Sequence, residues 1–453
     1  MTRTPIDRAR LSTLLETELC TYRDRNPRSA DAFSRTGHLL GGVPMTWMAK
    51  SAGPFPLYLD RARGARVTDL DGHELIDFCL GDTGAMAGHS PEATAAAVQR
   101  RYVELGGATT MMPTEDAEVV AAELSARFGL PTWSFSLTAT DANRWVLRLA
   151  RQVSGRRRIL VNSYSYHGSV DESFIVTSPD GPRSRGGNVG PAYDVTETSR
   201  VVEYNDLDAL ERELAHGDVA AVLMEPALTN MGIVLPEPGY LESVRALTRA
   251  AGTLLINDET HTLSAGPGGC TAAWELQPDI VTLGKAIAGG IPIGAYGLSA
   301  QLADRIWGDP ELDLVDTGGV GGTLAGNALS LAAARATLEQ VLTPDAFAGM
   351  IGLSTGYTAA VQQIIDSHEL PWTIAQLGAR AEYRFADPAP RNGTESYEAT
   401  DVELEDYLHL ALLNRGVFLT PFHNMALMSP ATTASDVQRH VEVLQDAVAA
   451  LRS

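Results

Sequence analysis

The chain has 453 residues, of which 44% are hydrophobic, so it is long enough for two or three domains around a large core. Its 35 basic and 56 acidic side chains give a formal net charge of −21, which disfavours binding to nucleic acid and to anionic membrane surfaces. Cys20, Cys79 and Cys270 stand far apart and predict neither a disulfide framework nor a metal site. Without a recognisable signal peptide or membrane-spanning run, we expect a cytoplasmic protein.

The two ends of the chain differ in pattern from its middle. Residues 1–75 combine a polar helix with a hairpin-like stretch, and residues 330–453 contain helices around a few strands. We expect both ends to form one smaller α+β domain. The predicted boundaries are 1–75 for its N-terminal part, 76–325 for a large domain and 326–453 for its C-terminal part.

The middle of the chain alternates short aliphatic or β-branched runs with segments of helical periodicity, such as 239–252. This alternation is typical of an α/β fold with helices packed on a mainly parallel sheet. The one long turn-rich segment is 177–200, which we expect to be either functional or a mobile surface loop. The predicted strands are 133–137, 158–163, 220–226, 253–258, 279–284 and 294–299.

Polar residues follow each of these strands, where ligands bind in open parallel sheets. After the strand at 133–137 comes TATDA (138–142), whose free amides and hydroxyls at a helix start are suited to phosphate, although a simple helix cap is the alternative interpretation. The P-loop and GxGxxG nucleotide motifs are both absent. Asp258 and Lys285 each end a strand, and they lie 27 residues apart in sequence.

A lysine in an apolar setting deprotonates readily and forms Schiff bases with carbonyl compounds. A nearby buried carboxylate needs a cationic partner, which a protonated pyridine nitrogen supplies. Pyridoxal phosphate (PLP) has an aldehyde, a pyridine nitrogen and a phosphate, so it accounts for Lys285, Asp258 and the 138–142 turn together. Tyr166 would give the ring an aromatic face. Individually, Tyr166 is also explained as a core residue and Asp258 as a helix cap.

The chain resembles the class III aminotransferases of PLP fold type I, and most of all the glutamate-1-semialdehyde aminomutase branch. The resemblance extends from about residue 41 to the C-terminus. It implies a mainly parallel seven-stranded sheet in the large domain. It rests on the ordered motifs DLDGHELIDF, GHSPE, TATDA, YHG, EP, NMG, DET, GK, GGIPIG and GTLAGN.

This resemblance implies a role for each matching residue. Lys285 would form the Schiff base and then act as the proton-transfer base, and Asp258 would pair with the pyridinium nitrogen. Thr323 would reach the phosphate of the neighbouring subunit, which implies a homodimer with a shared site. Ala139 and Thr140 match the phosphate-binding turn, Tyr166 would stack on the ring, and Glu225 and Asn230 fall near the cofactor or substrate. Thr260 departs from the family, which usually has valine there, and puts a hydroxyl near the ring. The expected cofactor-binding residues are therefore Ala139, Thr140, Tyr166, His167, Glu225, Asn230 and Thr260.

The departures from the family pattern concern the substrate. Met48 stands where the aminomutase branch has an arginine for the substrate carboxylate, next to Trp47, a candidate substrate residue. Arg380 and Arg384 are candidates for the missing anchor, with ordinary surface arginines as the alternative. No metal is expected.

The expected reaction is transamination of a small amine or amino acid, which loses its Cα proton to Lys285. Two alternatives stay open: an aminomutase, or an ammonia-lyase acting on a vicinal amino alcohol. The DETHT motif and residues 419–430 resemble a subgroup that includes hydroxyaminoethylphosphonate ammonia-lyase. A descendant that has lost catalysis is the non-enzymatic alternative, and the presence of Lys285 and Asp258 argues against it.

Overall fold

The computed structural model describes residues 6–309, 312 and 319–452. The chain divides into two compact units. Unit 1 comprises Met1–Ser90, Ala348–Ala389 and Ala399–Ser453, and unit 2 comprises Pro91–Phe347 and Pro390–Glu398. The domain boundaries placed at residues 75 and 325 from the sequence stay predictions.

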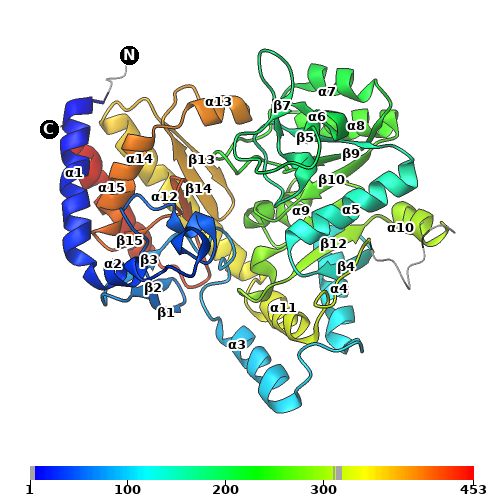
Figure 1. The fold of residues 1–453 in the computed structure, drawn as a ribbon, viewed down its shortest axis with the longest axis horizontal. Helices are drawn as coiled ribbons and strands as arrows, with labels where there is room; N and C mark the ends of the chain where they lie inside the picture. The colour runs from blue at the N-terminus through cyan, green and yellow to red at the C-terminus, as the bar shows by residue number, and fades with distance from the viewer. Residues whose placement is uncertain (1–5, 310–311, 313–318, 453) are drawn as a thin grey trace. The chain divides into compact units, whose positions relative to one another are not determined.

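Unit 2 is built on a seven-stranded sheet with the order β4-β12-β11-β10-β9-β5-β8 (Figure 1). Its strands pair in parallel except for β12, which is antiparallel to both β11 and β4. The mainly parallel sheet and the α/β class are therefore confirmed. The strands are β4 (Thr132–Ser136), β5 (Arg158–Asn162), β8 (Ser199–Val202), β9 (Val219–Met224), β10 (Leu254–Asp258), β11 (Ile280–Leu283) and β12 (Gly294–Leu298).

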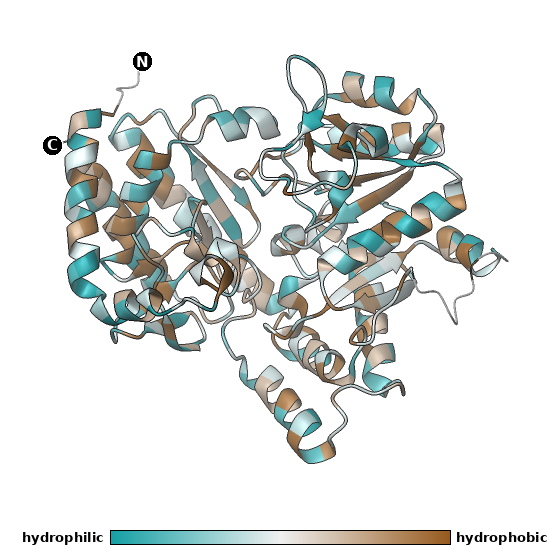
Figure 2. Ribbon diagram, in the orientation of Figure 1, coloured by the Kyte–Doolittle hydropathy of each residue, from teal (hydrophilic) through white to brown (hydrophobic). Residues whose placement is uncertain are grey.

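The sheet separates two apolar cores. Ile159 and Val161 of β5 belong to one core together with helix α5 (Ala139–Ser154), whereas Leu160 between them belongs to a second core with α7 (Leu207–Leu214) and α8 (Tyr240–Ala251). This is the alternation expected of a strand buried on both faces. Figure 2 shows α5 banded in brown and teal, in keeping with an amphipathic helix packed on the sheet.

The segment 177–200 is only partly irregular. It contains a two-residue strand, β7 (Arg183–Ser184), which pairs with β6 (Ile175–Val176), and a short helix, α6 (Val195–Thr198), and it runs into β8, which the sequence did not predict. The remaining helices of unit 2 are α3 (Glu92–Gln99), the π-helical η3 (Arg100–Leu105), α4 (Glu115–Phe128), α9 (Gly269–Ala273), α10 (Ala300–Trp307), α11 (Ala328–Gln340) and α13 (Gly393–Glu398).

Unit 1 holds two smaller sheets with helices against them, and α1 packs against α14 and α15. No helix among the described residues has the length and apolar character needed to cross a bilayer. One sheet contains β1 (Leu59–Arg63), β2 (Arg66–Asp69), β3 (Glu74–Asp77) and β15 (Val417–Phe418), and the other contains β13 (Thr373–Leu377), β14 (Arg380–Arg384) and β16 (Met425–Leu427). The helices are α1 (Arg8–Arg25), α2 (Pro27–Ser34), α12 (Pro344–Ser367), α14 (Val402–Leu413) and α15 (Ala434–Arg452).

Candidate active site

The ends of neighbouring strands bring the two central candidates to one edge of the sheet. Asp258 is the last residue of β10 and pairs in register with Thr282 of the parallel strand β11. Lys285 follows two residues after the end of β11 and opens the 3-10 turn η6 (Lys285–Ala288). Because β10 and β11 are adjacent and parallel, their carboxyl ends present both side chains at the same edge.

Asp258 is buried among hydrogen-bond donors. Its Oδ2 accepts hydrogen bonds from Asn143 Nδ2 at 2.8 Å and lies 2.9 Å from His167 Nδ1, while its Oδ1 accepts from the amide and the hydroxyl of Thr260. Burial by itself would raise the pKa of Asp258, but its hydrogen bonds and the nearby His167 hold that pKa below its usual value. The carboxylate is therefore kept ionised, as a partner for a pyridinium nitrogen must be.

Asn143 was not among the predicted site residues. Its side chain bridges three elements, donating to Asp258 and to the carbonyl of His167 and accepting from Thr282 Oγ1 at 2.7 Å. It is fully buried on the inner face of α5. A polar amide on the apolar face of a predicted helix was the one signal in the sequence that could have identified it.

Lys285 is half-buried, and its Nζ lies 2.8 Å from His261 Nε2. The residue has a φ of +50°, in the left-handed region that side chains other than glycine rarely occupy. His261 follows Thr260 after the end of β10, and nothing in its sequence pattern distinguishes it from an ordinary polar histidine. Its contact with Lys285 adds it to the residues around the candidate nucleophile.

The loop after β5 supplies the next group of predicted residues. The amide of Tyr166 donates to Glu225 Oε1 at 3.3 Å, and Asn230 Nδ2 donates to the carbonyl of Tyr164 at 2.8 Å. Burial raises the pKa of Glu225, although its hydrogen bond from Thr229 and the nearby His167 oppose this. The structure therefore brings Tyr166, Glu225 and Asn230 together around one loop, and His167 connects this loop to Asp258.

The predicted phosphate-binding turn stands between β4 and α5. Thr138 caps the helix by accepting from the amide of Asp141, so the capping interpretation holds for this residue. Thr140 faces the loop after β5 so closely that a Cβ added at Gly168 would lie 2.0 Å from its hydroxyl oxygen. A Cβ added at Gly284 would lie 3.1 Å from the Cβ and from the amide nitrogen of Ala139, a tight contact without overlap. Glycines at these positions keep the backbone close around the helix start, which is how backbone amides are made available to a phosphate.

The predicted substrate residues Trp47, Arg380 and Arg384 lie in unit 1. Trp47 packs edge-on against Phe422, with ring centroids 6.1 Å apart. Arg380 and Arg384 project from the same face of β14 and are 0% and 4% exposed, so the alternative that they are surface arginines is wrong. Their role toward substrate stays a prediction.

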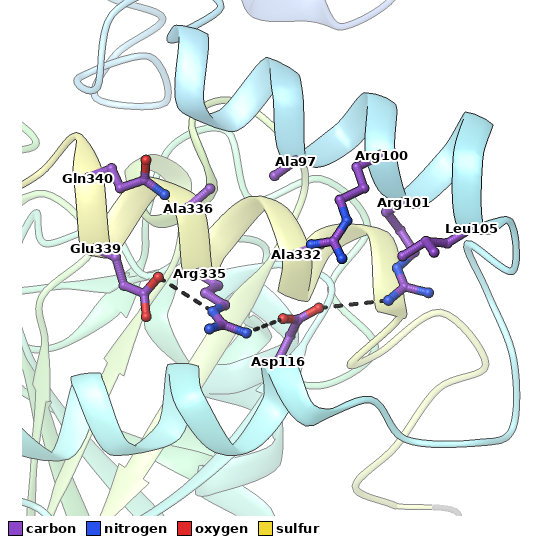
Figure 3. Close-up of a pocket in the computed structure, with 10 residues that line it drawn as sticks. All are labelled: Ala97, Arg100, Arg101, Leu105, Asp116, Ala332, Arg335, Ala336, Glu339 and Gln340. Carbon is purple, nitrogen blue, oxygen red and sulfur yellow. Dashed lines mark hydrogen bonds and ion pairs between the residues drawn. The ribbon is translucent and has the colours of Figure 1, made fainter.

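The cavity in Figure 3 is separate from these residues. It has a volume of about 260 Å³ and lies among α3, η3, α4 and α11, with Asp116 between Arg101 and Arg335. None of the predicted site residues lines it.

The comparisons with known proteins identify the family. Residues 47–448 match the model for aminotransferase class-III. The chain belongs to the class III aminotransferase family. A glutamate-1-semialdehyde 2,1-aminomutase of Desulfitobacterium hafniense is 32% identical over 94% of this chain and 99% of its own length. Class III aminotransferases depend on PLP, so the chain is a PLP-dependent enzyme of the transaminase or aminomutase type.

Solved structures agree in fold. A glutamate-1-semialdehyde-aminomutase from Pseudomonas aeruginosa PAO1 has a TM-score of 0.95 and 49% identity, covering 99% of this chain and 100% of that one. A lysine-to-alanine variant of such an enzyme from the same organism is in complex with PMP. An omega-transaminase from Sphaerobacter thermophilus has a TM-score of 0.87 and 28% identity, covering 96% and 100%. Fold type I is thereby confirmed.

The residues of this chain are chemically suited to the cofactor. An amine at the end of β11, an ionised carboxylate at the end of β10 and a glycine-lined helix start after β4 correspond to the aldehyde, the pyridine nitrogen and the phosphate of PLP. In addition, the buried Nε2 of His167 has no hydrogen-bond partner among the described residues, which leaves a polar atom for a ligand.

Proposed function

We propose that the protein is a transaminase that acts on a small amine or amino acid. The observation that carries this proposal is the pair formed by Lys285 and the buried, ionised Asp258 at the ends of adjacent strands. PLP supplies an electron sink for the carbanion that is left when the substrate loses its Cα proton. Transamination also requires a base beside the cofactor, and the amine of Lys285 is positioned for that role.

We assign roles to the remaining residues from the family resemblance, and their contacts support several of these roles. Lys285 binds the cofactor and then takes up and returns the proton, while His261 holds its Nζ. Asp258 keeps the pyridine nitrogen protonated because its charge is retained by Asn143, His167 and Thr260. Ala139 and Thr140, at the start of α5, would hold the phosphate, and Tyr166 would supply a face for the ring.

A second candidate is an aminomutase, which moves an amino group within one molecule. The names of the relatives favour it, since both the curated relative and the P. aeruginosa structure are called glutamate-1-semialdehyde aminomutases. In this chain Met48 occupies the position at which we expect an arginine in that branch. We place transamination first because it is the most common reaction of this family.

The test is to follow the visible absorption band of the bound cofactor while amino acids, amino alcohols and aminophosphonates are added without a keto acid. For a transaminase we expect loss of the band with about one equivalent of carbonyl product per site, and recovery only when a keto acid is added. An isomerised product with no net loss of amine would indicate an aminomutase. Continuous release of ammonia with the band retained would indicate a lyase. A protein that shows no such band after incubation with PLP would contradict the proposal.

We also propose that the enzyme acts as a homodimer in which Thr323 contributes to the partner's phosphate site. Thr323 is exposed, and it precedes α11, where the amide of Leu329 donates to the carbonyl of Ala108. Ala108 belongs to a segment with a large exposed apolar surface, in which Tyr102 is 65% and Met111 is 93% exposed. Apolar surface of this kind marks interaction sites, and a second copy would cover it and receive Thr323.

A further inference from the structure

Arg185 lies beside the loop after β5 and, among the described residues, forms no ion pair with a carboxylate. Its backbone amide donates to the carbonyl of Phe174, which fixes the segment after β7, and its Nη1 donates to the carbonyl of Ser165 at 3.1 Å. Ser165 directly precedes Tyr166, the residue assigned to the ring face. The guanidinium is thus anchored one residue from the cofactor's predicted stacking partner.

The guanidinium of Arg185 lies over an aromatic ring. Its guanidinium carbon lies 5.5 Å from the centre of the Tyr164 ring, and Tyr164 stacks on Tyr397 at 4.5 Å. The charged and titratable groups that act on Arg185 are Tyr164, Tyr166, Tyr397 and Glu225. Burial lowers its pKa, and these neighbours only partly oppose the effect. It is therefore a desolvated cation, and an arginine remains charged at any physiological pH.

Several other arginines in unit 2 form ion pairs with carboxylates, whereas Arg156, like Arg185, donates to backbone carbonyls. Arg151 pairs with Glu172, Arg200 with Asp218 and Arg245 with Asp279, each within 2.8 Å. Within the part of the chain that the structure describes, no acidic side chain forms an ion pair with Arg185. An anion that entered this position would complete the pairing.

The arginines of β14 are differently placed. Arg380 lies 3.6 Å from Asp82, and Arg384 lies 3.7 Å from Glu405, so each already has an acidic neighbour within unit 1. Glu382, which is buried between them on the same strand face, adds a further negative charge. Arg185, which forms no ion pair among the described residues, is therefore better placed than Arg380 or Arg384 to bind an anionic ligand.

We propose that Arg185 binds the anionic group of the substrate, a carboxylate or a phosphonate, and so replaces the anchor that is missing at Met48. This inference rests on the proposed function, because it takes the loop after β5 as the cofactor site. A guanidinium binds either oxyanion through two parallel hydrogen bonds, which gives orientation as well as affinity. The substrate class is accordingly a small amine that carries an oxyanion.

The experiment compares three amines of matched length on the holoenzyme: 3-aminopropanoate, 2-aminoethylphosphonate and the uncharged 3-aminopropan-1-ol. The measured quantity is the concentration of each amine that produces half of the change in the cofactor's visible absorption band. The variants are Arg185→Gln, Arg185→Lys and, as a matched control, Arg183→Gln. Arg183 is exposed and lies two residues away, at the start of β7.

We expect wild type to bind at least one of the two anionic amines about 30-fold more tightly than the alcohol, and Arg185→Gln to abolish that difference. Arg183→Gln should behave as wild type. Arg185→Lys keeps the charge but cannot form the bidentate pair, so it should weaken binding of the anionic amine about tenfold. If Arg185→Gln fails to fold, the result with Arg185→Lys tests the proposal instead. The preferred amine identifies the anion as carboxylate or phosphonate.

Two results would overturn the proposal: a wild-type enzyme with no preference for the anionic amines, or an Arg185→Gln holoenzyme that keeps it. In both cases the cofactor band and its response to the alcohol would be intact, so the proposed function would stand. Absence of the band from wild type itself would overturn the proposed function and this inference together.

Discussion

At the scale of single residues, the site depends on how the charge of Asp258 is maintained. Four hydrogen-bonding groups from Asn143, His167 and Thr260 surround a carboxylate that is 3% exposed. Without them, burial would favour the protonated acid. Under the proposed pairing of Asp258 with the pyridine nitrogen, the protonation of that nitrogen depends on residues that need not contact the substrate.

Asp258→Asn tests this dependence. The neutral amide no longer stabilises a protonated ring nitrogen, so we expect the rate of Cα proton exchange to fall on the order of 100-fold. Thr260→Val is the matched control, because it removes one hydrogen bond to the carboxylate and keeps the charge, and a fall of less than about tenfold is expected. The exchange rate is measured by loss of deuterium from the substrate. Equal rates for Asp258→Asn and wild type would exclude the assigned pairing.

At the scale of elements, the proposed phosphate-binding turn depends on a close approach of α5 and the loop after β5. Gly168 has a φ of +81°, and Thr140 fills the space where its side chain would be. The approach places the helix start against the loop that carries Tyr166 and His167. Backbone geometry therefore contributes to the site as much as side chains do.

Gly168→Ala should separate these two elements. We expect weaker PLP affinity by at least about tenfold and a loss of about 1–3 kcal/mol in the free energy of unfolding, since the added Cβ meets Thr140. Gly217→Ala is the control, because Gly217 has a φ of +70° with nothing within 4 Å of the added Cβ. It shares the backbone cost and lacks the clash. PLP affinity is measured by titration of the apo protein, and an equal loss in both variants would contradict the proposed packing.

The sequence predicted most of these elements and only part of the site. Six strands and the polar residues at their ends were identified because apolar runs and their termini are local patterns, whereas β8 was hidden behind the irregular segment 177–200. Asn143, His261 and Arg185 were missed as site residues because each is defined by a contact with a distant segment. The burial of Arg380 and Arg384 was likewise invisible in a strand whose alternate residues are charged.

At the scale of the whole molecule, unit 1 contains a histidine that gives stability a dependence on pH. His440 is fully buried, with Phe78 and Tyr357 each 4.8 Å from its ring. Burial, with a smaller contribution from His409, lowers its pKa to about 3. The unfolded chain binds a proton at this residue below about pH 6.5 while the folded chain does not, so acid destabilises the fold from pH 6.5 down to about 3.

His440→Leu should reduce this effect. Between pH 7 and pH 5 we expect the variant to lose about 2 kcal/mol less free energy of unfolding than wild type loses, as measured by urea denaturation. We compare the change in free energy of unfolding between the two proteins, because Glu405 is present in both. Burial raises the pKa of Glu405 to about 7, so its effect on stability between pH 7 and pH 5 is opposite to that of His440. His38→Leu, at an exposed position, is the control. Identical pH dependence in His440→Leu and wild type would refute this assignment.

The assembly of two chains is tested on the apolar segment around η3. Replacing Tyr102 and Val103 by aspartate places charge on a surface that a second copy would bury, so we expect light scattering to report a monomer. We expect this monomer to bind PLP at least about tenfold more weakly, since Thr323 would no longer reach a partner's phosphate. Trp307→Asp, at another exposed aromatic in unit 2, is the control. A monomer with full PLP affinity would remove Thr323 from the site.

The backbone conformation of Lys285 lowers the stability of the fold. At a φ of +50° glycine is the least costly residue, and a side chain there costs about 1–2 kcal/mol. A chain optimised for stability alone would carry glycine at 285. The cofactor-free Lys285→Gly protein should therefore exceed Lys285→Ala in free energy of unfolding by about 1 kcal/mol, as measured by urea denaturation, while both are inactive. The amine is thus maintained at a conformational cost that only its chemistry justifies.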